Sequence, residues 1–327
     1  MDWIEINIYT TSEGIEAVSG RLYQLGITGL QIEDAQEFKD FIDKNEPYWD
    51  YVDDELMVKK DCETYIKVYV SDNEYGKETF LAIKDSMKAL KEFDSDINFG
   101  RLDIELTNVN EEDWANNWKQ YFKPFPIGEK VIIKPSWEEY NEPTDRIIFD
   151  INPGMLFGTG THESTKLCIE ASERYVKNGD SVLDLGCGSG ILSIISLLLG
   201  ADNAVAVDID PNVIDISYAN AKMNGISKDR YSVLAGNVIT DERIKAQIGY
   251  RKYDLVFANI VADVIIALAT IVPTQIKSGG VLICSGIIDE RAGEVAKALK
   301  DNDFEILEIN KDNGWIGLVF RKGDLDA

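Results

Sequence analysis

One nine-residue stretch, VLDLGCGSG at 182–190, constrains the fold of this chain more than any other part of the sequence. Its apolar beginning is typical of a buried strand, and its glycines at alternate positions, Gly186, Gly188 and Gly190, indicate a tight turn into a helix. A turn without side chains lets the backbone approach a ligand, and the first amides of a helix are free to donate. A second apolar run then ends in Asp208, where a doubly wound α/β fold places an acid on ribose hydroxyls. We therefore expect an adenosine-containing cofactor.

The spacing of these glycines separates two classes of cofactor. A dinucleotide-binding turn has the pattern GxGxxG and would need a glycine at position 191, where this chain has Ile191. The observed pattern, GxGxG preceded by Asp184, resembles the first motif of the class I S-adenosylmethionine-dependent methyltransferases. The resemblance implies that the methionine part of the cofactor lies along the loop and that Asp208 binds the ribose diol. For the five-residue pattern alone, an ordinary strand-to-helix connection is the alternative.

Length and composition predict two domains and no membrane segment. The chain has 327 residues, of which 45% are hydrophobic, enough for two cores. The N-terminus lacks a basic region followed by an apolar stretch, and the longest nearly apolar run, 260–272, is too short to span a bilayer. The four cysteines form no CxxC pair, and one histidine does not complete a zinc site. We expect a soluble cytoplasmic protein with reduced thiols and no metal.

The charge of the chain is strongly negative and unevenly distributed. The chain has 58 acidic and 33 basic residues, and residues 1–110 alone hold 25 acidic and 11 basic ones. An acidic surface repels a phosphate backbone and attracts basic partners, so we expect a basic protein partner and no direct binding of nucleic acid or membrane. Solubility alone is the competing explanation for this charge. We expect a monomer.

The first hundred residues predict a small α+β domain. Strand patterns alternate with helical patterns in the order βαββαβ, which is that of a ferredoxin-like sandwich. In the first strand Ile4, Ile6 and Ile8 fall on one face, and polar and aromatic residues fall on the other. The expected strands are 3–10, 30–34, 64–71 and 98–109, and the expected helices are 15–26 and 76–93.

The rest of the chain divides into a connector and a larger α/β domain. Residues 110–143 include an aromatic stripe at helical spacing, Trp114, Trp118, Tyr121 and Phe122, before Pro124 and Pro126. We interpret the stripe as domain packing, with contact to the cationic sulfonium of the cofactor as the alternative. We therefore predict a substrate-recognition domain at 1–109, a linker with an aromatic helix at 110–143, and a methyltransferase domain at 144–327.

The larger domain shows a regular α/β pattern that ends in two consecutive strands. Strands are expected near 146–150, 181–185, 204–208, 231–235, 254–258 and 280–285, followed by FEILEIN and WIGLVFR. A closing hairpin with an antiparallel strand resembles the sheet of class I methyltransferases. The expected fold is thus a doubly wound Rossmann-like α/β domain with a smaller ferredoxin-like α+β domain.

A second motif narrows the resemblance to one family. Residues 152–165, NPGMLFGTGTHEST, form a Gly/Thr-rich loop ahead of a helix, and backbone amides and hydroxyls in such a loop suit an anionic group. The segment resembles the signature DPGxAFGTGxHxTT of the ribosomal protein L11 methyltransferases. Asn152 stands where that family usually has Asp, and this departure removes no matched contact. The resemblance covers essentially the whole chain and implies that S-adenosylmethionine contacts Thr165, Gly186, Asp208 and Asn259, with Gly188 and Gly190 completing the turn.

Two residues are candidates for the chemistry itself. Asn259 follows the strand YDLVF at the edge where a doubly wound sheet opens its ligand crevice. Methyltransferases that act on nitrogen often carry Asn-Pro-Pro-aromatic here, with the Asn oxygen accepting from the target amine, whereas this chain continues with Ile260 and Val261. His162, in the Gly/Thr loop, is the candidate base. A turn role for Asn259 and an orienting role for His162 are the alternatives.

These observations predict a protein N-methyltransferase. The resemblance implies transfer of methyl groups from S-adenosylmethionine to lysine amines, and to the N-terminal amine, of a basic ribosomal protein of the large subunit. The alternatives are a methyltransferase for RNA or a small amine, which the acidic surface and the additional domain disfavour, and a non-catalytic module that binds the cofactor.

Overall fold

The computed structural model describes residues 3–27, 29–34, 63–92, 97–107, 123–152 and 160–323. The chain divides into two compact units, Met1–Tyr121 and Phe122–Ala327. The aromatic helix expected around Trp114 and the central part of the Gly/Thr loop, residues 153–159, lie outside the described residues. Within the described ranges, no helix is both long enough and apolar enough to cross a membrane.

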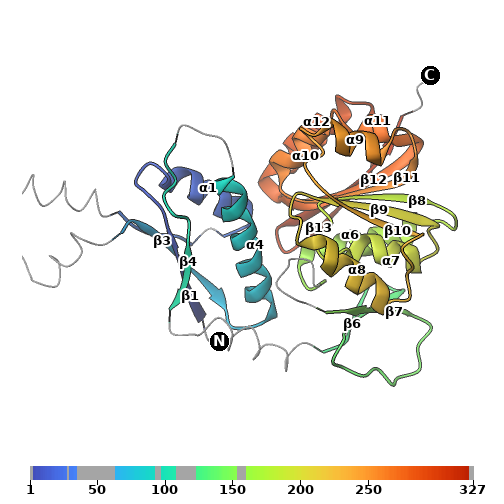
Figure 1. The fold of residues 1–327 in the computed structure, drawn as a ribbon, viewed down its shortest axis with the longest axis horizontal. Helices are drawn as coiled ribbons and strands as arrows, with labels where there is room; N and C mark the ends of the chain where they lie inside the picture. Colours follow the sequence, from blue (N-terminus) through green and yellow to red (C-terminus); the bar gives the residue numbers. More distant parts are fainter. Residues whose placement is uncertain are drawn as a thin grey trace, which may run out of the picture. The chain divides into compact units, whose positions relative to one another are not determined.

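The first unit is a four-stranded antiparallel sheet with two helices on one face (Figure 1). The strand order β2-β3-β1-β4, with a helix after β1 and another after β3, confirms the predicted ferredoxin-like arrangement. The described elements are β1 (Trp3–Tyr9), α1 (Ile15–Gln24), β2 (Gln31–Glu33), β3 (Tyr65–Ser71), α4 (Glu74–Lys91) and β4 (Ile104–Thr107).

The alternating pattern of β1 decides which face of this sheet is covered. Ile4, Ile6 and Ile8 are buried in a core that includes Leu22 of α1 and Met87 of α4. Successive side chains of a strand point to opposite faces, so the remaining residues of β1 lie on the face away from the two helices. This open face carries the exposed aromatic and acidic side chains described below.

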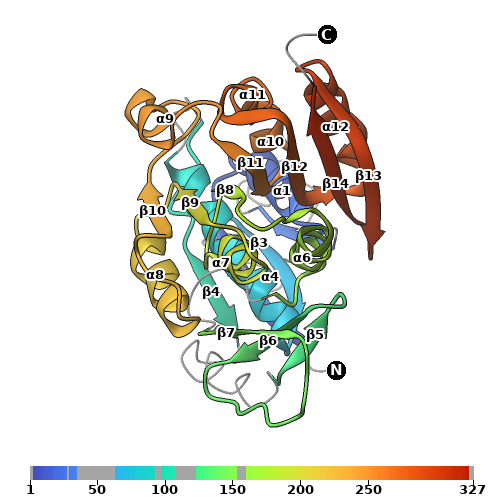
Figure 2. The same cartoon turned by 90° about the vertical axis from the view of Figure 1, so that its right-hand side faces the viewer.

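The second unit is built on a seven-stranded sheet in the order β10-β9-β8-β11-β12-β14-β13 (Figure 2). The first five of these strands are parallel, and β14 runs antiparallel between β12 and β13, as the predicted hairpin requires. The strands are β8 (Ser181–Leu185), β9 (Asn203–Asp208), β10 (Tyr231–Ala235), β11 (Tyr253–Asn259), β12 (Ile276–Ile288), β13 (Phe304–Asp312) and β14 (Trp315–Lys322).

Helices cover both faces of this sheet (Figure 1). On one face lie α6 (Glu163–Tyr175), α7 (Ile191–Leu198) and α8 (Val213–Met223); on the other lie α9 (Glu242–Ile248), α10 (Ala262–Leu268), α11 (Val272–Gln275) and α12 (Ala292–Lys300), the last preceded by a short 3-10 turn, η4 (Asp289–Arg291). Burial on both faces explains why the central strands are almost continuously apolar. The predicted doubly wound Rossmann-like fold is confirmed.

A three-stranded sheet in the second unit was not predicted. It consists of β5 (Phe125–Ile127), β6 (Val131–Pro135) and β7 (Ile147–Ile151), in that order. The expected strand at 146–150 is therefore present as β7, but it pairs with β6 and not with the large sheet. Pro126 lies in β5 and Pro135 ends β6, and prolines at strand edges are hard to distinguish from helix stops in the sequence.

Candidate active site

The three glycines of the motif form the turn between β8 and α7. Their φ angles are 79° at Gly186, 49° at Gly188 and 79° at Gly190, all in the left-handed region that favours glycine. A Cβ atom on Gly190 would lie 2.5 Å from the hydroxyl oxygen of Tyr231, a contact that real side chains do not make. The turn therefore carries few side chains, packs tightly against Tyr231, and leads directly into the first amides of α7.

Asp208 lies at the end of β9, beside this turn. One carboxylate oxygen accepts from the amide of Gly188 at 2.9 Å, and the other accepts from the amide of Asp210 at 3.1 Å. Burial raises the pKa of Asp208, while these amide hydrogen bonds lower it. The carboxylate is thus oriented by the glycine turn itself, which suits a group that must present its oxygens to a diol.

Asp184 lies beneath the turn and is almost completely buried. One of its oxygens accepts from the amide of Ser193 at 3.2 Å and from the hydroxyl of Ser193 at 2.8 Å. The other oxygen has no hydrogen-bond partner among the described residues. Burial raises the pKa of Asp184 to about 6, although the hydrogen bonds from Ser193 lower it. Asp184 therefore supports the start of α7 from within the core.

Asn259 ends β11, whose neighbour in the sheet is β8, so its position is next to the glycine turn. Its amide nitrogen donates to the hydroxyl of Thr165 on α6 at 3.2 Å. Thr165 is completely buried, and the side-chain oxygen of Asn259 is buried without a hydrogen-bond partner among the described residues. A buried amide oxygen without a donor is costly, so this atom is a candidate acceptor for a ligand.

His162 caps the helix α6. Its Nδ1 accepts from the amide of Ser164 at 3.2 Å and lies 2.8 Å from the Ser164 hydroxyl. The imidazole also packs edge-on against the indole of Trp315 on β14, with ring centroids 4.5 Å apart. Side chains that accept from the second or third helical amide stabilise a helix start, so these contacts of His162 are those of a helix cap.

Two residues on α8 join the loops of the site, and the sequence analysis missed them. Asn220 donates to the carbonyl of Ser189 at 2.9 Å and accepts from the amide of Asn152 at 3.2 Å. Ser217 donates to the carbonyl of Gly188 at 2.9 Å. Both side chains are buried, so α8 ties the beginning of the Gly/Thr loop to the glycine turn. Their spacing at i and i+3 on one helix face was the available signal.

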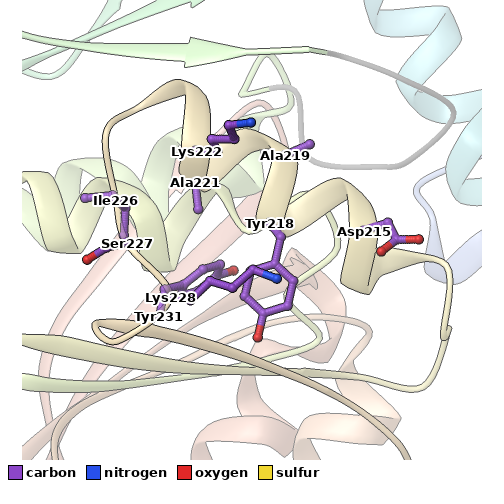
Figure 3. Close-up of a pocket in the computed structure, with 9 residues that line it drawn as sticks. All are labelled: Asp215, Tyr218, Ala219, Ala221, Lys222, Ile226, Ser227, Lys228 and Tyr231. Atoms are coloured by element: carbon purple, nitrogen blue, oxygen red, sulfur yellow. The ribbon is translucent and has the colours of Figure 1, made fainter.

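A cavity of about 480 Å³ is lined by residues of α8, of the segment that follows it and of β10 (Figure 3). The helix residues that line it alternate with Ser217 and Asn220, which face the glycine turn. Its lining contains none of the predicted site residues; it consists of Asp215, Tyr218, Ala219, Ala221, Lys222, Ile226, Ser227, Lys228 and Tyr231. The candidate active site therefore lies at the strand ends and not in this cavity.

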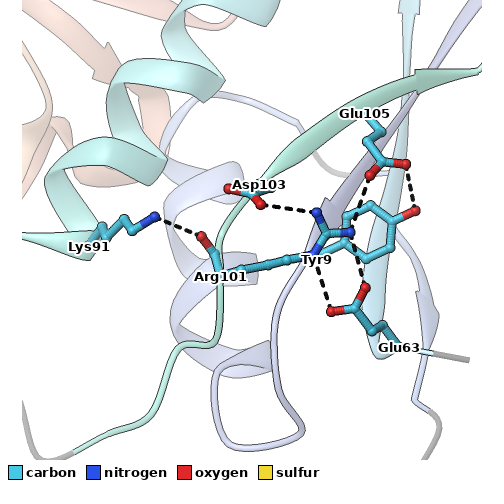
Figure 4. A network of polar contacts seen from close by, with 6 residues as sticks. All are labelled: Tyr9, Glu63, Lys91, Arg101, Asp103 and Glu105. Atoms are coloured by element: carbon cyan, nitrogen blue, oxygen red, sulfur yellow. Dashed lines mark hydrogen bonds and ion pairs between the residues drawn. The ribbon is translucent and has the colours of Figure 1, made fainter.

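The open face of the small sheet carries a cluster of charges around Arg101 (Figure 4). The guanidinium carbon lies 3.7 Å from the ring centroid of Tyr9, and its nitrogens contact Glu63, Asp103 and Glu105 at 3.0–3.2 Å. Three carboxylates, each more than half exposed, surround one guanidinium. The cluster is therefore negative in sum, and its carboxylates are more exposed than buried.

The residues at the site fit S-adenosylmethionine. The glycine turn around Gly188 presents backbone without side chains, Asp208 presents a carboxylate beside it, and the Asn259 oxygen supplies an acceptor that no described donor satisfies. Within the described part of the chain, no group of three or more His, Cys, Asp or Glu side chains could hold a metal ion. Burial raises the pKa of the Cys187 thiol well above its usual value, which favours packing over nucleophilic reactivity.

Comparison with known proteins decides the family. The match to the family described as ribosomal protein L11 methyltransferase (PrmA) extends over residues 2–323. The chain belongs to this family. A curated relative, ribosomal protein L11 methyltransferase of Lachnospira eligens, is 39% identical over 324 residues, which cover 98% of this chain and 100% of the relative. A crystal structure of ribosomal protein L11 methylase from Lactobacillus delbrueckii subsp. bulgaricus aligns at a TM-score of 0.56 and 28% identity, covering 62% of this chain and 100% of that one.

Membership of the ribosomal protein L11 methyltransferase family confirms the resemblance seen in the sequence. The chain is an S-adenosylmethionine-dependent methyltransferase, which excludes a non-catalytic binding module.

Proposed function

We propose that this chain transfers methyl groups from S-adenosylmethionine to lysine amines, and to the N-terminal amine, of ribosomal protein L11. The names of its relatives support the substrate. The observation that carries the proposal is the buried oxygen of Asn259, for which the described residues supply no donor, at the edge of the sheet beside the glycine turn. An acceptor of this kind suits an amine that arrives with N–H groups to donate.

In this proposal the protein mainly binds, orients and excludes water. Thr165, Gly186, Gly188, Gly190, Asp208 and Asn259 hold the cofactor, which supplies an electrophilic methyl group when bound. A lysine amine has a pKa of about 10.4 and must lose a proton before its lone pair can react. Burial beside Asn259 lowers the pKa of the amine and favours the neutral form. The Asn259 oxygen then accepts one N–H and thereby aims the lone pair.

The hydrogen bond from Asn259 to Thr165 supports this orientation. Because the amide nitrogen is engaged by the threonine hydroxyl at 3.2 Å, the amide oxygen is left for the substrate. We propose that His162 acts through the helix that it caps, since Thr165 lies in the first turn of that helix. A role for His162 as a general base stays a prediction, to be tested by a pH profile.

We further propose that residues 1–109 recruit the substrate through the open face of their sheet. The carboxylates around Arg101 suit the basic surface of a ribosomal protein. Trp3 and Tyr69 on the same face are 60% and 47% exposed, and aromatic side chains of this kind are enriched at protein interfaces. We also propose that the protein is a cytoplasmic monomer and that it binds neither nucleic acid nor membrane.

The test is to incubate the purified chain with methyl-labelled S-adenosylmethionine and total ribosomal components, and then to digest separate samples with protease or ribonuclease. We expect label that only protease releases, in a single protein that mass spectrometry identifies as L11. Asn259→Ala should reduce kcat roughly 100-fold, the scale on which one preorganised hydrogen-bonding group contributes to catalysis. Label released by ribonuclease would contradict the proposed substrate, and an unchanged kcat for Asn259→Ala would contradict the proposed acceptor.

A further inference from the structure

Ile260, the residue after Asn259, lies between two glycines that are distant in sequence. Gly186 belongs to the glycine turn and Gly286 to β12, and their φ angles are 79° and 77°. A Cβ atom on Gly186 would lie 2.3 Å from Cγ2 of Ile260. A Cβ atom on Gly286 would lie 2.7, 2.9 and 3.0 Å from the backbone O, C and N of Ile260. Real Cβ atoms essentially never approach so closely, so both contacts require glycine.

The strand on the Gly286 side is firmly held. Asn259 is in register with Ser285 in the parallel pairing of β11 and β12, and the amide of Ile260 donates to the Ser285 carbonyl at 3.1 Å. Ser285 is completely buried, and its hydroxyl donates to the carbonyl of Ile316 on β14 at 2.9 Å. The pairing of β12 with β14 shifts register between Cys284 and Ile287, a stretch that contains both Ser285 and Gly286. Gly286 therefore lies within this register shift, next to Ser285, which is held by hydrogen bonds to Ile260 and Ile316.

Ile260 stands at a position where many other methyltransferases have a rigid residue. Methyltransferases that act on nitrogen often have proline after the Asn, and proline fixes its own φ angle. Ile260 has no such internal constraint, so its position must come from its surroundings. The two glycines can supply this constraint, because Gly186 limits the position of the Ile260 side chain and Gly286 limits the position of its backbone.

We infer that Gly286 is a positioning residue for methyl transfer. Because it lacks a side chain, the Ile260 backbone packs against β12, and this contact holds Asn259 in register with the glycine turn. The inference rests on the proposed role of Asn259 as the acceptor for the amine. Gly286 itself acts only through Ile260.

The decisive variant is Gly286→Ala, with Gly279→Ala as its matched control. Gly279 lies in the same strand with a φ of 73°, and a Cβ atom there would meet no atom within 4 Å. Both variants share the strain of alanine in a left-handed conformation, but only Gly286→Ala displaces the Ile260 backbone. We expect kcat to fall roughly 10- to 100-fold in Gly286→Ala, because small misplacements in an active site have effects of this size. The KM for L11 should not change, and Gly279→Ala should retain the kcat of the unaltered protein.

A second pair of variants separates the two contacts. The Gly186 contact involves the Ile260 side chain, so Ile260→Ala should partly restore the S-adenosylmethionine affinity of Gly186→Ala in calorimetry. The Gly286 contact involves backbone atoms, so Ile260→Ala should not restore the kcat of Gly286→Ala.

Equal kcat values for folded Gly286→Ala and Gly279→Ala would overturn the inference, as would rescue of Gly286→Ala by Ile260→Ala. Should Gly286→Ala fail to fold, Ile260→Ala alone tests the inference. Its backbone contact with Gly286 remains, so kcat should stay within about 2-fold of that of the unaltered protein, whereas a loss of about 10-fold would assign the positioning to the Ile260 side chain and overturn the inference. Failure of the proposed function is recognised separately, because Asn259→Ala would then keep full kcat or the unaltered chain would not methylate L11.

Discussion

The four-stranded sheet of the first unit and the seven-stranded sheet of the second unit present their polar groups in different ways. In the large sheet both faces are covered by helices, and the polar groups of the site gather where β8, β9 and β11 end. In the small sheet the described helices cover one face, and charged and aromatic groups are spread over the other. A sheet edge between covered faces excludes water and suits chemistry on a small group, whereas an open face suits recognition of a broad surface. This difference supports our proposal that the large sheet carries out the reaction and the small sheet recognises the substrate.

This contrast predicts the largest effect for a charge at the edge of the large sheet. Asp208→Asn keeps the size of the side chain but removes the charge that we expect to bind the ribose diol. Since hydrogen bonds to charged groups contribute about 1.5–3 kcal/mol, the Kd for S-adenosylmethionine should rise roughly 100-fold in calorimetry. Asp210→Asn, in the same loop, is the control and should have a much smaller effect. Equal losses in both variants would mean that general loop charge, and not Asp208, binds the cofactor.

A buried carboxylate in the large unit should make its stability depend on pH. The pKa of Asp184 is about 6 in the folded chain against an ordinary value of 3.8, so the folded state holds an additional proton between these values. Stability is therefore lost as pH rises through this window, and the loss is complete above about pH 6. From pH 5 to pH 8, the unfolding free energy of the unaltered chain should fall by about 1.5 kcal/mol more than that of Asp184→Asn. Urea denaturation of both proteins at each pH measures this difference. A difference that is independent of pH would contradict this account.

The open face of the small sheet should affect substrate capture without affecting the chemical step. Tyr69 on this face and Tyr23 on α1 are 47% and 46% exposed, so they form a matched pair. Tyr69→Ala should raise the KM for L11 about 5-fold with unchanged kcat, because truncation of an interface residue commonly costs about 1 kcal/mol. Tyr23→Ala should leave both constants unchanged. The reverse result would transfer substrate recruitment to the helical side of the unit.

The smallest effect is expected at His162. His162→Ala removes the cap of α6 and should lower the unfolding free energy by about 0.5–1 kcal/mol, whereas His162→Asn supplies another capping acceptor. If capping is its role, the pH dependence of kcat will be the same for His162→Asn and the unaltered chain. Loss of the basic limb of the pH profile in His162→Asn would instead identify His162 as the base.

The sequence predicted those features that are encoded in consecutive residues. The glycine turn, Asp208 and Asn259 lie at strand ends that periodicity alone could locate, and the fold and cofactor class followed from them. The three-stranded sheet was missed because β5 and β6 are short and carry Pro126 and Pro135. These strands lie within the segment that we assigned to a linker.

Other parts of the site could not be predicted because they depend on contacts between distant segments. Asn220 joins two loops from a helix that carries no motif, and the packing of Trp315 against His162 spans half the chain. The contact between Gly286 and Ile260 depends on the register of β11 and β12, which composition does not reveal. Local patterns therefore located the polar groups of the site, and tertiary packing orients them.

The antiparallel strand β14 affects the order in which the strands of the large sheet can assemble during synthesis. It separates β12 from β13, although β13 precedes it in the chain, so β13 cannot join the sheet on the ribosome until Trp315–Lys322 have been synthesised. The same strand brings Trp315 to the capping histidine of α6 and the Ile316 carbonyl to Ser285. The motifs of the candidate site are translated much earlier than β14, so residues that emerge late complete the packing around the site. A nascent chain that stops before β14 carries every predicted site residue but lacks the contacts that orient these residues.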